Sequence, residues 1–368
     1  MDKIPQSRLD RGFQEHQKEY EEKALSVLRS GWYVLGEEVK NFEQEYASYI
    51  GTKHCVGLAN GLDALWITFR VLGIGPGDEV IVQGNTYIAS VMGITMNGAT
   101  PVFVEPDRYY QIDAEKIEEK ITDKTKAVLV VHLYGQAAQM SKVREICDRH
   151  GLLLVEDCAQ SHGARWEGRM TGSFGDVGCW SFYPSKNLGA FGDAGAVTTD
   201  RDDLAEAFRV FRNYGSEKRY YNKVVGAKSR LDELQAGLLR VRLGHLPELN
   251  EERKKQAAFY EEHIDNPLVI KPEVREGSES VWHQYVLRVP QHRDALRTCL
   301  EEKGVGTLIH YPIPPHLSEA YAYLGKKEGS YPVTEQYAKE VLSLPLYAGM
   351  TKEEQQAVAD AVNAFRVL

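Results

Sequence analysis

The chain has 368 residues, of which 43% are hydrophobic and 26% charged, with 32 glycines and 14 prolines, as in ordinary globular proteins. This length fits one large domain with a smaller companion, and the composition excludes disordered, collagen-like and fibrous classes. Acidic residues outnumber basic ones by 53 to 44, for a net charge of −9. The sequence contains no cluster of basic residues that would attract a phosphate backbone, so nucleic acid is not expected as a partner.

Cysteine usage and the first residues predict the compartment. The five cysteines are an odd number, lie far apart and include no C-x-x-C pair, so neither a disulfide framework nor a zinc knuckle is expected. The residues up to Lys23 are polar and acidic, and no stretch reaches the ~18 apolar residues of a membrane span. We expect a soluble, cytoplasmic protein without a membrane partner. The histidines show no H-x-x-H or H-x-x-x-H spacing, so no metal site is predicted.

From about residue 53, short apolar runs rich in β-branched residues alternate with segments of helical period. This alternation predicts an α/β fold with a large, mostly parallel, doubly wound sheet and helices on both faces. The predicted strands are 54–58, 79–82, 101–104, 127–131, 152–155, 178–182 and 196–198.

The pattern then changes to a long helical stretch over 231–264, in which Pro247 should kink or break the helix. We interpret this stretch as the exit from a large domain, 1–246, into a small α+β domain, 247–368. A strand at 282–289 and a helix at 293–303 are predicted in the small domain.

Polar residues follow the buried strand at 152–155, in the segment EDCAQSH that contains Asp157. Ligands of open α/β folds bind at the carboxyl ends of the parallel strands. Asp157 could therefore bind a ligand, or it could merely cap the next helix.

Lys186 lies in a loop rich in Gly, Ser and aromatic residues, WSFYPSKNLG, after another apolar strand. An apolar aromatic setting lowers the pKa of a lysine and favours the neutral amine that attacks a carbonyl. Imine chemistry is one interpretation of Lys186, and a solvated loop lysine is the other.

A third segment, HCVGLANGLDAL, leads from a strand through a tight turn into a helix. Asn60 is a suitable N-cap and Asp63 could complete a shortened capping box, so Gly61 and Leu62 would present free backbone N–H groups. Such a helix start binds anions, although many capped helices bind nothing.

Together, these three features match the needs of pyridoxal phosphate. A carboxylate keeps the pyridine nitrogen protonated, a lysine holds the aldehyde as an imine, and backbone N–H groups bind the phosphate. The sequence therefore predicts this cofactor.

The strings VEDCAQSHGA, GSFGDVGCWSFYPSKNLGAFGDAGAVTT and SRLDELQAGLL resemble the signature segments of the sugar-nucleotide aminotransferase family of the DegT/StrS type. The likeness runs from about residue 35 to 345 and implies the aspartate-aminotransferase fold, fold type I of pyridoxal-phosphate enzymes. It implies that Lys186 forms the imine and shuttles the proton and that Asp157 pairs with the pyridine nitrogen. The remaining cofactor contacts that it implies are Gln160 to the ring hydroxyl, Tyr87 stacked on the ring, and Gly61, Leu62 and Ser181 to the phosphate.

The resemblance also implies a homodimer in which the partner completes each active site from the segment before Arg230. Here the sequence departs from the family, because Lys228 replaces the usual Asn; a Lys can still meet a phosphate as a point charge. Leu62 and Ser185 are smaller departures, where Thr or Ser and Gly, respectively, are common.

The sequences of several segments, including HYPIP at 310–314, are most similar to those of family members that aminate C3 of a nucleotide-linked 3-keto-6-deoxyhexose. This likeness implies that Tyr183, His310 and Tyr311 lie near the sugar or nucleotide, that the nucleotide is dTDP, and that L-glutamate donates the amine. The family also includes dehydratases with His at the imine position, which Lys186 argues against. The alternatives are a 4-keto sugar or a 2-acetamido-3-keto uronate as acceptor, and a pyridoxal-phosphate-binding regulator without turnover.

Overall fold

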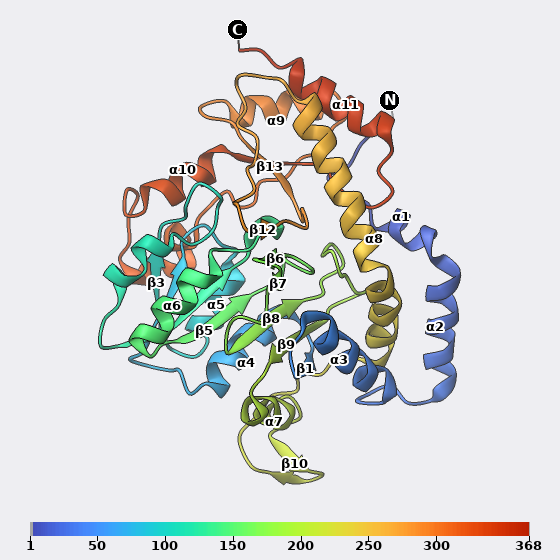
Figure 1. The fold of residues 1–368 in the computed structure, drawn as a ribbon, viewed down its shortest axis with the longest axis vertical. Coiled ribbons are helices and arrows are strands. Elements are labelled where there is room, and N and C mark those ends of the chain that lie inside the picture. The colour runs from blue at the N-terminus through green and yellow to red at the C-terminus, as the bar shows by residue number, and fades with distance from the viewer. Residues whose placement is uncertain (1–2, 368) are drawn as a thin grey trace.

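The computed structural model describes residues 3–367 and is built around a seven-stranded sheet with helices on both faces (Figure 1). The strand order is β1-β9-β8-β5-β4-β2-β3, and only β9 runs antiparallel to its neighbours. The predicted mostly parallel sheet is confirmed. Its strands are β1 (His54–Leu58), β2 (Glu79–Gln83), β3 (Thr100–Val104), β4 (Thr125–Val131), β5 (Leu153–Asp157), β8 (Val177–Ser181) and β9 (Gly195–Thr199).

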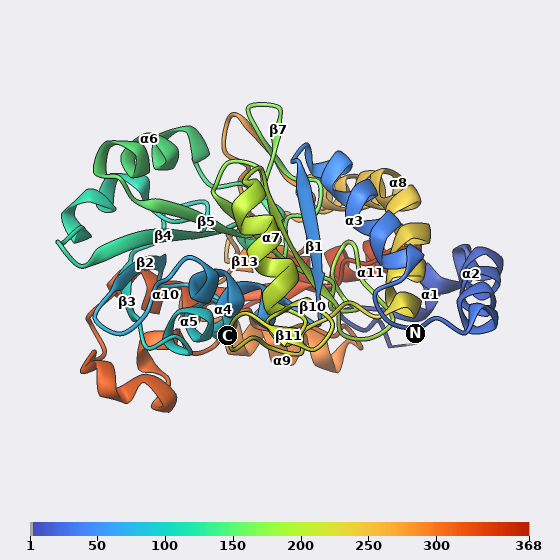
Figure 2. The ribbon, with the colours of Figure 1, turned by 90° about the horizontal axis from the view of Figure 1, so that it is seen from below.

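Successive side chains of a strand point to opposite faces of the sheet, so they pack against different helices. Val80 and Val82 of β2 belong to one buried cluster with α4 (Gly61–Val71), α5 (Ile88–Thr95) and α7 (Asp202–Phe211). Ile81 packs on the opposite face with α6 (Met140–His150). On that face α3 (Glu37–Ile50) and α8 (Glu233–His263) cover the end of the sheet near β1 (Figure 2).

The predicted site segments meet because β1, β5 and β8 run in the same direction. Asp157 ends β5, Ser181 ends β8 just before the Lys186 loop, and β1 leads into the N-terminus of α4. All three segments therefore lie at one edge of the sheet, where open α/β folds bind ligands.

Helix α8 continues through Pro247, so the predicted interruption does not take the form of a break. A proline inside a helix removes one backbone hydrogen bond and costs about 3 kcal/mol or more. Burial of Leu246 and Leu249, together with packing of α8 against α2 (Gln17–Ser30) and α3, offsets this cost. The division at residue 246 falls inside α8 and stays a prediction.

The C-terminal part pairs β13 (Tyr285–Arg288) with β14 (Val341–Leu344) and surrounds this ribbon with helices. The predicted strand and helix there are confirmed, with slightly different bounds. Ile4 packs into the same buried cluster and pairs with Val305, so the start of the chain joins the C-terminal part. The helices are α9 (Arg293–Glu302), α10 (Pro332–Glu340) and α11 (Lys352–Asn363).

The remaining elements are short. The N-terminal segment begins with α1 (Leu9–Glu15), and a hairpin of β10 (Ser216–Lys218) and β11 (Tyr221–Asn222) projects below α7 in Figure 1. A small antiparallel sheet contains β12 (Ser278–Glu279), β6 (Arg165–Trp166) and β7 (Arg169–Met170). Within residues 3–367, no helix combines the length and the apolar character that crossing a bilayer requires.

Candidate active site

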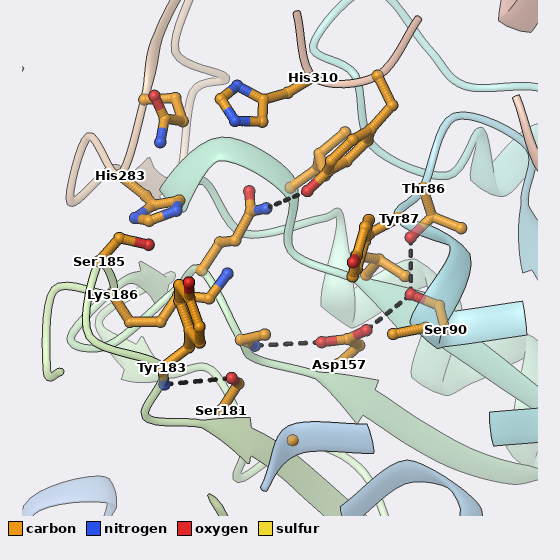
Figure 3. Close-up of a pocket in the computed structure, with 18 of the residues that line it drawn as sticks. Thr86, Tyr87, Ser90, Asp157, Ser181, Tyr183, Ser185, Lys186, His283 and His310 are labelled. Atoms are coloured by element: carbon orange, nitrogen blue, oxygen red, sulfur yellow. Dashed lines mark hydrogen bonds between the residues drawn. The ribbon is translucent and has the colours of Figure 1, made fainter. Parts of the chain in front are cut away.

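A cleft of about 860 Å³ opens at the carboxyl edge of the sheet, between the sheet and the C-terminal part (Figure 3). All but one of the predicted site residues line it. These are Gly61, Leu62, Tyr87, Asp157, Gln160, Ser181, Tyr183, Lys186, His310 and Tyr311. Residues from distant parts of the sequence thus share one cavity.

Lys186 lies half-buried in the loop after β8, and its backbone N–H donates to the carbonyl of Tyr183 at 2.8 Å. Burial lowers the pKa of Lys186 from 10.5 to about 8, although the nearby charge of Asp157 favours the ammonium form. A lysine with this pKa is partly neutral at physiological pH. The structure thus favours the interpretation of a reactive amine over that of a solvated loop lysine.

The loop is anchored by the residue that follows Lys186. The Asn187 amide donates to Asn250 Oδ1 at 2.8 Å and to the Val281 carbonyl at 3.0 Å, and its oxygen accepts from His283 Nδ1 at 3.0 Å. These partners come from α8 and from the segment that leads into β13. The loop that carries Lys186 is therefore held in place by two distant parts of the chain.

Asp157 is buried at the end of β5 with both carboxylate oxygens hydrogen-bonded. Ser90 Oγ donates to Oδ2 at 2.8 Å and the Ala159 N–H donates to Oδ1 at 3.1 Å, while Thr86 Oγ1 lies 2.7 Å from Ser90 Oγ (Figure 3). Burial raises the pKa of Asp157, whereas these hydrogen bonds and the charge of Lys186 oppose the rise. Residues 158–164 form turns rather than a helix, so the alternative role as a helix cap is wrong.

The start of α4 forms the predicted N-cap, because Asn60 Oδ1 accepts the Asp63 N–H at 2.8 Å. The Asp63 carboxylate instead accepts from Trp66 Nε1 and Ser229 Oγ, so the second half of the predicted capping box is not formed. A Cβ added to Gly61 would lie 2.4 Å from the Ser181 Cβ. Glycine thus lets the first turn of α4, with its unpaired N–H groups, approach the Ser181 hydroxyl.

The floor of the cleft holds an amide and two aromatic rings. Gln160 Oε1 accepts the Tyr134 N–H at 2.7 Å, and its Nε2 donates to Tyr311 Oη at 3.2 Å. The Tyr311 ring lies 5.0 Å from that of Tyr87, centroid to centroid. Gln160 and Tyr311 are thus oriented by contacts with their neighbours in the chain.

Tyr183 and His310 were predicted near the sugar or nucleotide. Tyr183 lines the cleft with 55% of its surface exposed, which leaves it open to a ligand. His310 Nδ1 lies 2.8 Å from Ser343 Oγ, and burial together with the charge of Lys186 lowers the pKa of His310 to about 4. His310 is therefore neutral at pH 7 and offers a hydrogen bond rather than a positive charge.

Lys228 is the predicted site residue that does not line the cleft. Its side chain is exposed, and its backbone bridges to Asn213. The adjacent Ser229 Oγ donates to Asp63 at 2.6 Å and accepts the Ala59 N–H, which holds this segment against the start of α4.

Sequence reasoning missed Ser90, Thr86 and His283. Ser90 follows Tyr87 by three residues, which is the spacing of one helix face, and this signal could have identified it. His283 carried no such signal, because only the packing of the C-terminal part brings it to Asn187.

The sequence matches the DegT/DnrJ/EryC1/StrS aminotransferase family over residues 14–363. It is 51% identical to a dTDP-3-amino-3,6-dideoxy-alpha-D-galactopyranose transaminase of Aneurinibacillus thermoaerophilus, over 95% of this chain and 96% of that protein. The structure matches Streptomyces venezuelae DesV in complex with a ketimine intermediate, with TM-score 0.97, 46% identity and all of both chains covered.

A second solved structure, Bacillus subtilis NtdA with bound cofactor PMP, matches with TM-score 0.91 and 31% identity, over 98% of this chain and 85% of that one. These matches confirm the predicted fold type I of pyridoxal-phosphate enzymes and the predicted cofactor. The chain therefore belongs to the DegT/DnrJ/EryC1/StrS aminotransferase family.

Proposed function

We propose that this protein is a pyridoxal-phosphate-dependent transaminase that aminates C3 of a dTDP-linked 3-keto-6-deoxyhexose, with L-glutamate as the amino donor. The product would be a nucleotide-linked 3-amino-3,6-dideoxyhexose. The observation that carries the proposal is one cleft that holds a lysine with a lowered pKa, a buried carboxylate and a helix N-terminus.

The side chains of the cleft fit the cofactor. Asp157 would pair with the pyridine nitrogen, since its carboxylate is already oriented by Ser90 and Ala159. The close approach of Gly61 to Ser181 forms a cradle for the phosphate, which the N–H groups of Gly61 and Leu62 would bind. When bound, the cofactor supplies an electron sink for breaking a C–H bond next to an amino nitrogen.

Lys186 would move the proton in both halves of a ping-pong reaction. Its neutral Nζ would take the proton from the α-carbon of glutamate, whose amino nitrogen would stay with the cofactor while water releases the carbon skeleton as 2-oxoglutarate. An Nζ proton would later be delivered to C3 of the sugar as the sugar takes up that nitrogen. A pKa of about 8 suits both directions, because neutral and charged forms are then both populated near pH 7 to 8. Gln160, Tyr183 and His310 would orient the reactants around this amine.

The alternative acceptors are a 4-keto sugar and a 2-acetamido-3-keto uronate. The name of the Aneurinibacillus relative, a 3-amino-3,6-dideoxy sugar transaminase at 51% identity, supports C3 of a 6-deoxyhexose. A regulator without turnover is less well supported, because it would need neither the lowered pKa of Lys186 nor the hydrogen bonds that orient Asp157.

We further propose that the protein acts as a cytoplasmic homodimer with shared active sites. All five cysteines are free thiols, as expected in a reducing compartment. Lys228 is exposed and lies outside the cleft of its own chain, a position from which it could reach the site of a second subunit.

The test mixes the holoenzyme with glutamate and a panel of nucleotide-linked 3-keto and 4-keto sugars and follows product masses. Lys186→Ala should fold but lose at least ~10³-fold in turnover, because both the covalent anchor and the proton carrier are gone. Lys339→Ala, at an exposed lysine paired with Glu328, is the matched control.

Borohydride reduction and peptide mapping should label Lys186; a label on another lysine would refute the assignment. Turnover of a 4-keto sugar alone would refute the regiochemistry.

A further inference from the structure

Arg253, on α8, is a buried cation that lines the cleft and has no acidic partner. Only 7% of its surface is exposed, and its Nη1 donates to the carbonyls of Trp282, His283 and Leu346 at 3.2–3.3 Å. Within residues 3–367, no carboxylate oxygen lies within 4.0 Å of its guanidinium nitrogens, and Nε and Nη2 donate no hydrogen bond. The other arginine that is buried in this described part of the chain, Arg212, pairs with Glu43.

An unpaired buried charge is costly, so proteins rarely retain one without a ligand or partner. The three carbonyls account for one end of the guanidinium and fix its orientation. The other edge, Nε and Nη2, is left over, and this pair of parallel donors matches the two oxygens of a carboxylate.

Arg253 is connected to the loop of the reacting amine through His283. The His283 carbonyl accepts from Arg253, and the His283 ring donates to Asn187, which directly follows Lys186. Burial lowers the pKa of His283, and the charges of Lys186 and Arg253 lower it further, so both cations lie near this ring. An anion bound by Arg253 would thus be held close to the Lys186 loop.

We infer that the Nε and Nη2 edge of Arg253 binds a carboxylate of the amino donor. The inference rests on the proposed function, in which that donor is glutamate. The α-carboxylate of glutamate is bonded to the carbon that carries the reacting amine, and the carbon of the γ-carboxylate is three bonds from that same carbon. The nearest phosphorus of a nucleotide sugar is four bonds from C3, which is further than either carboxylate carbon of glutamate is from the carbon that carries the amine.

The test compares Arg253→Gln and Arg253→Lys with Lys254→Gln, a control that removes a positive charge from the next position of α8, outside the cleft lining. Glutarate, a dicarboxylate without an amine, is titrated into the holoenzyme by calorimetry. The two half-reactions are followed separately for the KM of glutamate and of the nucleotide sugar.

Arg253→Gln should weaken glutarate binding and raise the KM of glutamate by about 10- to 100-fold, the range for hydrogen bonds to a charged group, while the sugar half-reaction changes by less than about 2-fold. Arg253→Lys should lose less, because it keeps the charge without the planar fork. If Arg253→Gln does not fold, Arg253→Lys decides, since it still donates to the carbonyls. Glutamine and 4-aminobutyrate, which lack the γ- and the α-carboxylate respectively, identify the carboxylate that is bound.

Unchanged glutarate affinity in the folded variants would overturn the inference, and so would a loss confined to the sugar half-reaction, which would assign Arg253 to the diphosphate. A wild-type protein that binds glutarate through Arg253 but accepts no amine from glutamate would contradict the proposed donor alone.

Discussion

The lowered pKa of Lys186 predicts how fast the protein without cofactor reacts with pyridoxal phosphate at each pH. With a pKa of about 8, roughly 1 amine in 11 is neutral at pH 7, whereas a lysine at 10.5 has roughly 1 in 3,000. Only the neutral amine attacks the aldehyde, so Lys186 should present about 300 times more reactive amine at pH 7 than an ordinary lysine.

The assay mixes cofactor-free protein with excess pyridoxal phosphate between about pH 6 and pH 10 and follows the absorbance of the imine. The rate should rise almost 10-fold per pH unit well below pH 8 and level off above it, because most of the amine is then neutral. Lys186→Ala supplies the background from other lysines.

Asp157 provides the test of the electrostatic reasoning. Its charge raises the pKa of Lys186 against the effect of burial, so Asp157→Asn should move the midpoint of the rate profile to lower pH, while Asp157→Glu should move it less. A midpoint near 10 in the wild type would refute the claim that burial controls this lysine. An upward shift in Asp157→Asn would refute the assigned role of the carboxylate.

Other variants test the cradle, the sugar contacts and the shared site. Gly61→Ala should destabilise the fold by about 1–3 kcal/mol in denaturant titrations and weaken cofactor binding, because the added methyl overlaps the serine at the end of β8; Gly244→Ala, in open space on α8, should instead be stabilising by about 0.5–1 kcal/mol. Tyr183→Phe and His310→Ala should slow the sugar half-reaction by about 10-fold and spare the glutamate half-reaction, and equal losses in both would contradict their placement at the sugar. Lys228→Ala should weaken cofactor retention more at low than at high salt, with recovery in Lys228→Asn; unchanged affinity would exclude a phosphate contact.

Much of the fold followed from local patterns. The bounds of β1, β5 and β8 were predicted to within two residues. The reason is that short apolar runs rich in β-branched residues, bounded by turn residues, rarely form anything but strands. The N-cap at Asn60 was predicted for the same reason, since an N-cap depends only on the next few residues. Pro247 shows the limit of local rules, because burial of neighbouring leucines of α8 outweighed the preference of proline to end a helix.

The sequence by itself determined which residues follow the ends of β5 and β8, and parallel strands bring such residues to one edge of the sheet; this is why Asp157 and Lys186 were identified together. Only the tertiary structure decided which distant residues control them. Ser90 reaches Asp157 from α5, His283 reaches the Lys186 loop from the C-terminal part, and Arg253 enters the cleft from α8. These contacts join segments far apart in the chain, so they depend on how helices pack against the sheet, and short-range periodicity carries no information about that packing.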